Sequence, residues 1–266
     1  MNQAVLTDHE FKQFRELIYN IAGINLSDAK KPLVTGRLSK RVRQHGHSNF
    51  SGYFETLMQD KDELQIAVNL LTTNETYFFR EPKHMDFLAE KLLQARPLGR
   101  PFRLWSAASS SGEEAYSLTM VLADRLGDGP WEIVGSDIST RMLDKARGGH
   151  YSLERTNGIP RSYLKRFCLK GIGTQTGTFK VSSELRDRVS FHQVNLVEPL
   201  PQLGDFDAIF LRNVMIYFDV DTKRQVVNRL LPRLRSGGYF FVSHSESLNG
   251  VSDALKLVSP SIYRKP

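Results

Sequence analysis

The segment from Arg103 to Asp137 constrains the fold more than any other part of the chain. A short apolar stretch (102–105) leads into a run of small residues (107–112), and apolar residues then recur at helical spacing over 113–122. A second apolar stretch (131–136) ends on Asp137. The order strand, tight turn, helix, strand and acid predicts a nucleoside site. Small residues let the backbone approach a ligand, and the acid can hydrogen-bond ribose hydroxyls.

The turn after the first predicted strand restricts the kind of nucleoside. It holds a single glycine, Gly112, so the GxGxxG pattern of dinucleotide sites is absent, and no GK[ST] of triphosphate sites follows. Glu113 and Glu114 would repel a phosphate at the helix start, where phosphate-binding proteins offer free amides. A cationic nucleoside without phosphate, such as S-adenosylmethionine, is better suited to a helix start that carries two glutamates.

Two regions with different patterns predict two lobes. Residues 1–80 carry amphipathic helical patterns and no strand signal, which predicts an all-helical domain; the first helix ends near Gly23 and a basic one ends at Gly46. Residues 81–101 predict a connecting helix (83–95) and a loop (97–101).

After residue 101 strand and helix patterns alternate. Strands are predicted at 102–105, 131–136, 189–195, 206–211 and 239–243, helices at 139–147 and 221–235, and an antiparallel edge segment at 255–264. This alternation predicts a doubly wound, mostly parallel α/β sheet over 102–266. A small β-subdomain is expected as an insertion at about 150–188, with its β signal at 171–181.

Composition excludes several classes of protein. The chain has 266 residues and a single cysteine, Cys168, which rules out a disulfide framework and a cysteine-based metal site. His45 and His47 lack further ligands at a workable spacing, so we predict no metal. The N-terminus has no signal-peptide pattern and no apolar run is long enough to span a membrane, so we expect a cytoplasmic protein without membrane insertion.

The formal net charge of +7 is concentrated in two stretches. Residues 29–54 hold six Lys or Arg and no acid, and residues 141–170 hold eight against two acids. Such stretches attract nucleic acid or acidic protein surfaces, although a solvated helix face is an equally simple interpretation.

Five segments together resemble one known family. They are 71–81 (LTTNETYFFRE), 105–117 (WSAASSSGEEAYS), 136–139 (SDIS), 212–219 (RNVMIYFD) and 243–246 (SHSE). In this order they resemble the chemotaxis protein methyltransferases of the CheR type. The resemblance implies an S-adenosylmethionine-dependent enzyme that esterifies glutamate side chains on the cytoplasmic helical bundle of chemoreceptors. It also implies a helical domain, a doubly wound (Rossmann-like) catalytic domain and an inserted β-subdomain.

The resemblance also implies roles for individual residues. Arg80 would hold a carboxylate, and Tyr217 would place its hydroxyl near the transferred methyl group. The cofactor would be bound by these residues together with Asn74, Thr76, Ala108, Glu114, Asp137, Asn195, Leu196, Arg212 and Asn213.

Simpler interpretations stay open at four of these positions. Arg80 could form a surface salt bridge or stack on a neighbouring phenylalanine, Asn74 and Thr76 could cap a helix, and Tyr217 could pack under the next helix. The sequence does not separate Glu114 from its neighbour Glu113 as the ligand of the methionine ammonium group. His244 and Glu246 receive no role.

Two surfaces are candidate receptor contacts. The family lays a basic helix, here carrying Arg37, Arg41 and Arg43, against the acidic receptor bundle. In some members the β-subdomain docks a receptor tail peptide. The chemistry needs no metal and no general base, because a glutamate with a pKa near 4.3 is already an anion at neutral pH. The product of the cofactor would be S-adenosylhomocysteine.

Two other functions are compatible with such a fold. An RNA methyltransferase would also be basic, but the segment 211–217 lacks the proline-aromatic pattern of adenine-N6 enzymes, and Cys168 lacks the context of a cytosine-C5 nucleophile. A non-catalytic module that senses the cofactor is the second alternative. We expect no nucleic-acid partner.

Overall fold

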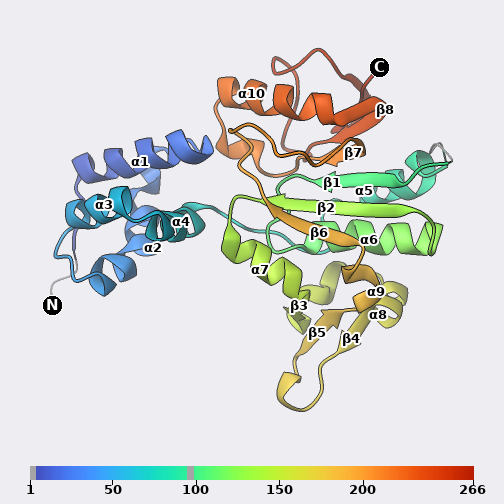
Figure 1. The fold of residues 1–266 in the computed structure, drawn as a ribbon, viewed down its shortest axis with the longest axis horizontal. Coiled ribbons are helices and arrows are strands. Elements are labelled where there is room, and N and C mark those ends of the chain that lie inside the picture. The colour runs from blue at the N-terminus through green and yellow to red at the C-terminus, as the bar shows by residue number, and fades with distance from the viewer. Residues whose placement is uncertain (1–3, 95–98) are drawn as a thin grey trace.

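The chain forms a helical lobe, a seven-stranded sheet and a small three-stranded sheet (Figure 1). The computed structural model describes residues 4–94 and 99–266, so the predicted helix end at Ala95 and part of the loop at 97–101 lie outside the described residues. The helices are α1 (Asp8–Ala22), α2 (Lys31–Gln44), α3 (Phe50–Gln59), α4 (Lys61–Leu71), α5 (Pro82–Phe87), α6 (Glu113–Leu126), α7 (Thr140–Gly148), α8 (Arg161–Phe167), α9 (Ser183–Arg186) and α10 (Val220–Leu230). The strands are β1 (Phe102–Ser106), β2 (Trp131–Asp137), β3 (His150–Ser152), β4 (Cys168–Lys170), β5 (Thr178–Val181), β6 (Val189–Gln193), β7 (Phe206–Phe210), β8 (Leu234–Phe241), β9 (Lys256–Ser259) and β10 (Ile262–Arg264).

The helical lobe contains α1 to α4, and no strand is described between residues 4 and 80. Helix α1 is capped at its start by Thr7, which exchanges hydrogen bonds with Glu10 in a capping box, and at its end by Gly23 with φ +70°. Its apolar stripe buries Phe14 and Ile18 against the neighbouring helices. The predicted all-helical lobe is confirmed. Of the helices in the described ranges, none is long and apolar enough to cross a membrane.

The large sheet has the strand order β6-β2-β1-β7-β8-β10-β9. Strands β6, β2, β1, β7 and β8 are parallel, whereas β10 runs antiparallel to both β8 and β9 at the edge. This is the predicted doubly wound, mostly parallel sheet. The chain order reverses between β1 and β7, and the carboxyl ends of strands at such a reversal border a natural ligand crevice.

Helices cover both faces of the sheet, so its central strands are buried on both sides. On β1, the fully buried Leu104 belongs to the core shared with α6, whereas Trp105 belongs to the core shared with α10 and the helical lobe. The Trp105 ring packs against Phe206 of β7 with ring centroids 5.2 Å apart.

The β-subdomain lies between α7 and β6 and contains the antiparallel sheet β3-β5-β4. Within the stretch 171–181, which carries the predicted β signal, Thr178–Val181 forms strand β5. Gly173 and Gly177 have φ values of +56° and +88° and form the turn that precedes β5.

The segment at 221–235 differs from the prediction of one continuous helix. Helix α10 ends at Leu230, and β8 already begins at Leu234. Pro232 has no N–H for a helical hydrogen bond, and Leu234 pairs with Phe206 of β7. Gly237, with φ +76°, lies inside β8 near a register shift with β7 rather than at a helix end.

Candidate functional site

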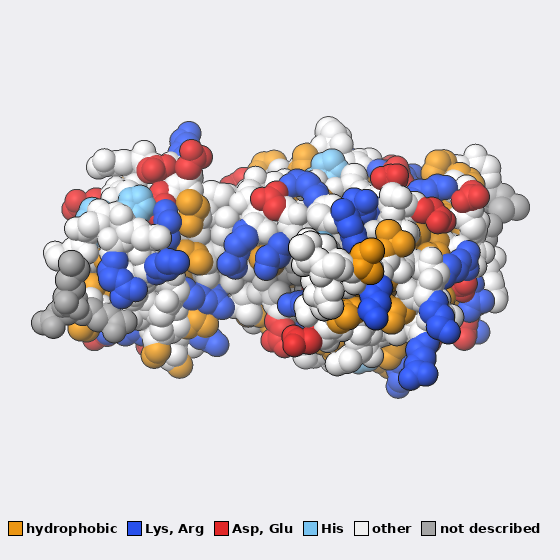
Figure 2. All heavy atoms as spheres, turned by 90° about the horizontal axis from the view of Figure 1, so that it is seen from below, with side chains coloured by type: hydrophobic (Ala, Val, Ile, Leu, Met, Phe, Trp, Pro, Cys, Tyr) orange, Lys and Arg blue, Asp and Glu red, His pale blue; other side chains and the backbone are white. Residues whose placement is uncertain are grey.

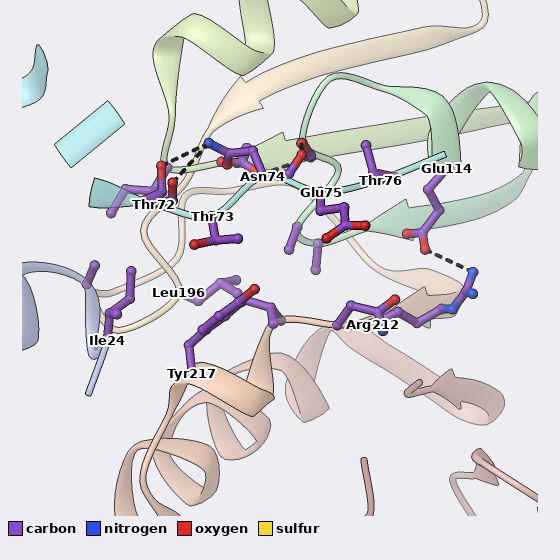
Figure 3. A pocket seen from close by; sticks show the side chains of 18 of the residues that line it. Ile24, Thr72, Thr73, Asn74, Glu75, Thr76, Glu114, Leu196, Arg212 and Tyr217 are labelled. Carbon is purple, nitrogen blue, oxygen red and sulfur yellow. Dashed lines mark hydrogen bonds and ion pairs between the residues drawn. The ribbon is translucent and has the colours of Figure 1, made fainter. Parts of the chain in front are cut away.

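A pocket lies where the helical lobe meets the carboxyl edge of the sheet (Figure 3). It encloses about 940 Å³ including its open mouth, and it lies at the reversal point between β1 and β7. Its wall is formed by the end of α1, the segment 72–80 and the turns after β1, β2, β6 and β7. The pocket wall contains every predicted site residue: Asn74, Thr76, Arg80, Ala108, Glu114, Asp137, Asn195, Leu196, Arg212, Asn213 and Tyr217.

The turn after β1 is held close to the end of β2. The backbone N–H groups of Ser110 and Ser139 each donate to one carboxylate oxygen of Asp137, both at 2.9 Å. Burial raises the pKa of Asp137, and these donors oppose the shift. Gly112 has φ +95°, and a Cβ there would lie 2.9 Å from the Cβ of Ala146, so the turn requires glycine at this position. The acid is thereby fixed on the pocket wall.

The structure separates the two glutamates that open α6. Glu114 lines the pocket, where its Oε1 accepts from the Ser106 hydroxyl at 2.7 Å. Burial raises the pKa of Glu114, and Arg212 opposes the shift. Glu113 is fully buried beside the β-subdomain, where it pairs with Arg155.

Arg212 lies at the carboxyl end of β7 and joins three parts of the site. Its Nη1 lies 3.1 Å from Glu114 Oε2, and its Nη2 donates to the carbonyl oxygen of Arg80 at 2.6 Å. Nη2 also lies 3.3 Å from Glu81 Oε2. The side chain of Arg212 is only 1% exposed, so its charge depends on these carboxylates. Arg212 is therefore part of the pocket wall and is held by α6 and by the segment that follows the helical lobe.

The guanidinium of Arg80 forms fewer polar contacts than that of Arg212. Its Nη1 donates to the carbonyl oxygen of Glu75 at 3.0 Å, and its guanidinium lies 5.4 Å from the ring centre of the half-exposed Tyr77. None of the carboxylates in the described ranges forms an ion pair with Arg80. The predicted alternative of a surface salt bridge is therefore absent there, and stacking occurs on Tyr77 instead of Phe78 or Phe79.

Asn74 and Thr76 belong to an extended segment, and the next α-helix begins only at Pro82. They therefore do not cap a helix, which removes the alternative interpretation of these residues. The carbonyl oxygen of Asn74 accepts from Ser110 Oγ at 3.0 Å, and that of Thr76 accepts from Arg155 Nη1 at 3.1 Å. The segment is thus attached to both the turn after β1 and the β-subdomain.

The opposite side of the pocket joins the two lobes. The side chain of Asn195 donates to the carbonyl oxygen of Ile21 at 2.6 Å, and the backbone N–H of Asn25 donates to that of Tyr217 at 2.8 Å. Figure 3 shows the Tyr217 side chain directed into the pocket beside Leu196.

Glu246, which the sequence analysis left without a role, supports the pocket wall from outside the pocket lining. Its Oε2 accepts from the N–H groups of Asn213 and Ser243 at 3.0 and 2.9 Å, and its Oε1 accepts from that of Ile216 at 3.2 Å. Asn213 has φ +58°, a strained conformation for a residue with a side chain. Glu246 therefore holds the turn between β7 and Tyr217, although it is 33 residues from Asn213 in the sequence.

The basic helix α2 presents its arginines in different ways. Arg37 donates to the carbonyl oxygens of Leu71 and Thr72 at 2.9 and 3.0 Å, and Arg41 forms a two-pronged ion pair with the buried Glu63. Arg43 is exposed. Figure 2 views the molecule from below relative to Figure 1. On the face seen there, Lys and Arg side chains are spread over both lobes, with acidic and apolar side chains between them.

Comparison with known proteins identifies one family over both lobes. Residues 9–72 match the family described as CheR methyltransferase, all-alpha domain, and residues 74–263 match CheR methyltransferase, SAM binding domain. The chain is 44% identical over 260 residues to chemotaxis protein methyltransferase 2 of Pseudomonas aeruginosa, covering 97% of this chain and 93% of that protein. It is 40% identical over 263 residues to the chemotaxis protein methyltransferase of Escherichia coli, covering 97% and 91%. The chain therefore belongs to the CheR family of S-adenosylmethionine-dependent chemotaxis methyltransferases.

Proposed function

We propose that this protein transfers the methyl group of S-adenosylmethionine to glutamate side chains of chemoreceptors and so forms glutamyl methyl esters. The observation that carries the proposal is Arg80, a guanidinium on the pocket wall that forms no ion pair with a described carboxylate. A planar guanidinium binds a carboxylate through two parallel hydrogen bonds. Arg80 is therefore suited to hold either the substrate glutamate or the carboxylate of the cofactor.

The chemistry is a direct displacement. A carboxylate oxygen forms a bond to the methyl carbon while the bond from that carbon to the sulfonium sulfur breaks, and S-adenosylhomocysteine leaves as a neutral thioether. The nucleophile is already ionised at neutral pH, so no proton has to be removed. In keeping with this, the described residues that line the pocket include no His, Cys or Lys. The protein has to align the reactants and exclude water.

The cofactor is proposed to lie along the pocket with its methionine end at Glu114 and its adenine at Asn195 and Leu196. Glu114, next to Ala108, would accept the ammonium group of the methionine end, and Asp137 would accept hydrogen bonds from the ribose. Asn195 and Leu196 would border the adenine. The remaining contacts would come from residues on either side of the reacting centre: Asn74, Thr76, Arg212 and Asn213.

Tyr217 is proposed to direct its hydroxyl toward the transferred methyl group. Its position opposite the segment 72–76 and its orientation into the pocket support this role (Figure 3). Together with Arg80 it would define where the substrate carboxylate enters.

The proposed partner is the helical bundle of the receptor. Exposed basic residues of α2, Arg43 first among them, would face its acidic surface, and charge pairing of this kind speeds encounter and weakens with salt. The β-subdomain exposes Leu169 and Ile172, which are 62% and 82% exposed, and these suit a receptor tail peptide. The proposed substrate region is cytoplasmic, so the proposal places the enzyme in the cytoplasm, with neither nucleic acid nor membrane as a partner.

The test is incubation with methyl-labelled S-adenosylmethionine and a chemoreceptor cytoplasmic fragment, followed by mild base. We expect the label to be released as volatile methanol, which identifies an ester. Arg80→Ala should lower kcat/KM on the order of 100-fold. Arg224→Ala is the matched control, because this exposed arginine on α10 pairs locally with Asp221.

Other outcomes would contradict the proposal in distinct ways. Label that survives base would indicate methylation of nitrogen or nucleic acid. Cofactor binding without any labelled receptor would indicate the non-catalytic sensing module. A loss in Arg80→Ala no larger than in Arg224→Ala would remove Arg80 from the site.

A further inference from the structure

Three metal-ligating side chains converge outside the cofactor pocket. They are Glu81, His84 on α5, and His244 in the turn after β8, and their ligand atoms all lie within 4.8 Å of one another. The two histidine rings are 5.0 Å apart at their centres. The cluster lies against a separate surface pocket lined in part by His84, His244 and Ser261.

The orientation of His84 is fixed by a hydrogen-bond chain on its far side. The Ser261 hydroxyl donates to the carbonyl oxygen of Pro260 at 2.6 Å, so its oxygen is left to accept from Nε2–H of His84 at 2.7 Å. This arrangement puts the proton on Nε2 and a lone pair on Nδ1. A hydrogen bond of this kind on the second ring nitrogen is the usual support of a metal-bound histidine.

The lone pair of His84 Nδ1 faces another acceptor. Nδ1 lies 3.4 Å from Glu81 Oε2, and both atoms are buried without a hydrogen-bond partner, although Arg212 Nη2 lies 3.3 Å from the same carboxylate oxygen. His84 is only 1% exposed. Two buried acceptors that face one another repel unless a cation lies between them, and buried polar atoms without partners are rare in folded proteins.

We propose that Glu81, His84 and His244 bind a zinc ion through one carboxylate oxygen and two imidazole nitrogens. Zinc–nitrogen and zinc–oxygen bonds of about 2.0–2.1 Å put two ligands of a tetrahedral ion about 3.3–3.4 Å apart, which the Glu81–His84 distance matches. Two imidazoles favour zinc over magnesium or calcium. The exposed His244 leaves the fourth position open to water from the surface pocket.

The charges around the cluster are compatible with an ion. Arg212 Nη2 lies 3.3 Å from Glu81 Oε2, and Arg212 Nη1 pairs with Glu114. When Glu81 binds the metal, the carboxylate of Glu114 therefore still balances the positive charge of Arg212. Backbone strain also concentrates here, since Glu81 and Ser261 have φ values of +56° and +60°. Such conformations persist where the surrounding structure enforces them, often at binding sites.

The ion would join two walls of the cofactor pocket. Glu81 directly follows Arg80, and His244 lies two residues before Glu246, which holds the turn containing Asn213. Bound zinc would tie the connecting segment to the C-terminal part of the sheet. We therefore expect it to raise the melting temperature of the protein.

The experiment titrates metal-stripped full-length protein with Zn²⁺ in competition with a chromophoric chelator, and repeats the titration with Co²⁺. We expect one ion per chain and the strong visible absorption of tetrahedral Co²⁺. His244→Ala should weaken binding at least about tenfold, as loss of one ligand does. The backbone N–H of His244, which lies 3.3 Å from Glu81 Oε1, survives this substitution, so the fold should persist.

The control is His192→Ala, an exposed histidine on β6 whose Nε2 lies 3.1 Å from the hydroxyl oxygen of Ser190. It should leave the affinity unchanged. No binding at one equivalent, an affinity unaffected by His244→Ala, or an equal loss in both variants would overturn the proposal. None of these readouts uses methyl transfer, so they stand apart from the proposed function.

Discussion

Arg212 Nη1 lies 3.1 Å from Glu114 Oε2, and this contact joins the carboxyl end of β7 to the first turn of α6. Both side chains are largely buried, at 1% and 13% exposure. They lie at the reversal point of the sheet, so the ion pair is part of the pocket wall itself.

Arg212→Met should destabilise the protein by about 3–5 kcal/mol, because it leaves the carboxylate of Glu114 buried without its charge partner. It should also weaken S-adenosylmethionine binding. Urea unfolding and calorimetric titration measure the two effects. Arg224→Ala, which removes a surface pair, should cost less than about 1 kcal/mol. A similar cost in both variants would mean that the buried pair has no special role.

Glu246→Ala should lower kcat/KM by about 10–100-fold, because the backbone donors of Asn213, Ile216 and Ser243 lose their shared acceptor. Glu246→Gln keeps one acceptor oxygen and should recover part of this loss. Steady-state kinetics with separate kcat and KM values test the prediction. Glu184→Ala, on the exposed surface of α9, should match the wild type, and the idea fails if Glu246→Ala does too.

The stability of the helical lobe should fall in acid because of Glu63. Burial alone would raise the pKa of Glu63, but hydrogen bonds from Arg41, Tyr53 and His45 outweigh it and lower the pKa to about 2. A lowered folded-state pKa stabilises the protein above the unfolded value of 4.5, and this contribution is lost as the pH falls toward 2.

This contribution is on the order of 3 kcal/mol. The free energy of unfolding, measured against pH for wild type and Glu63→Gln, should therefore converge between pH 4.5 and 2. Curves that stay parallel throughout that range would contradict the assignment.

Arg43→Glu should slow receptor methylation without changing cofactor affinity or stability, because Arg43 is exposed on α2. The rate difference should shrink as salt is added. Arg41→Glu should behave differently and destabilise the protein, since it would put a second carboxylate beside the buried Glu63. Equal loss of cofactor affinity in Arg43→Glu would refute the receptor-contact role.

Part of the site could be predicted because some of its residues follow local patterns, whereas the others were implied by the family resemblance. Asp137 comes at the end of a predicted strand and Arg212 at the end of another, and the carboxyl ends of parallel strands meet at one edge of a sheet. The short run of small residues before Glu113 likewise identified the turn. The helix predicted over 221–235 was wrong at its end, because a local pattern did not decide the structure there. Leu234 pairs with β7, and Pro232 has no N–H to continue the helix, although the apolar residues keep helical spacing.

The sequence by itself determined the two-lobe order and the doubly wound sheet, because periodicity and strand ends are local properties of the chain. The resemblance to a known family supplied most of the residues around the pocket. Only the tertiary structure decided which of Glu113 and Glu114 faces the cofactor site, what Glu246 holds, and that Glu81, His84 and His244 meet. Those facts depend on contacts between residues far apart in the chain. Such contacts are set by how helices and strands pack, and no local pattern records them.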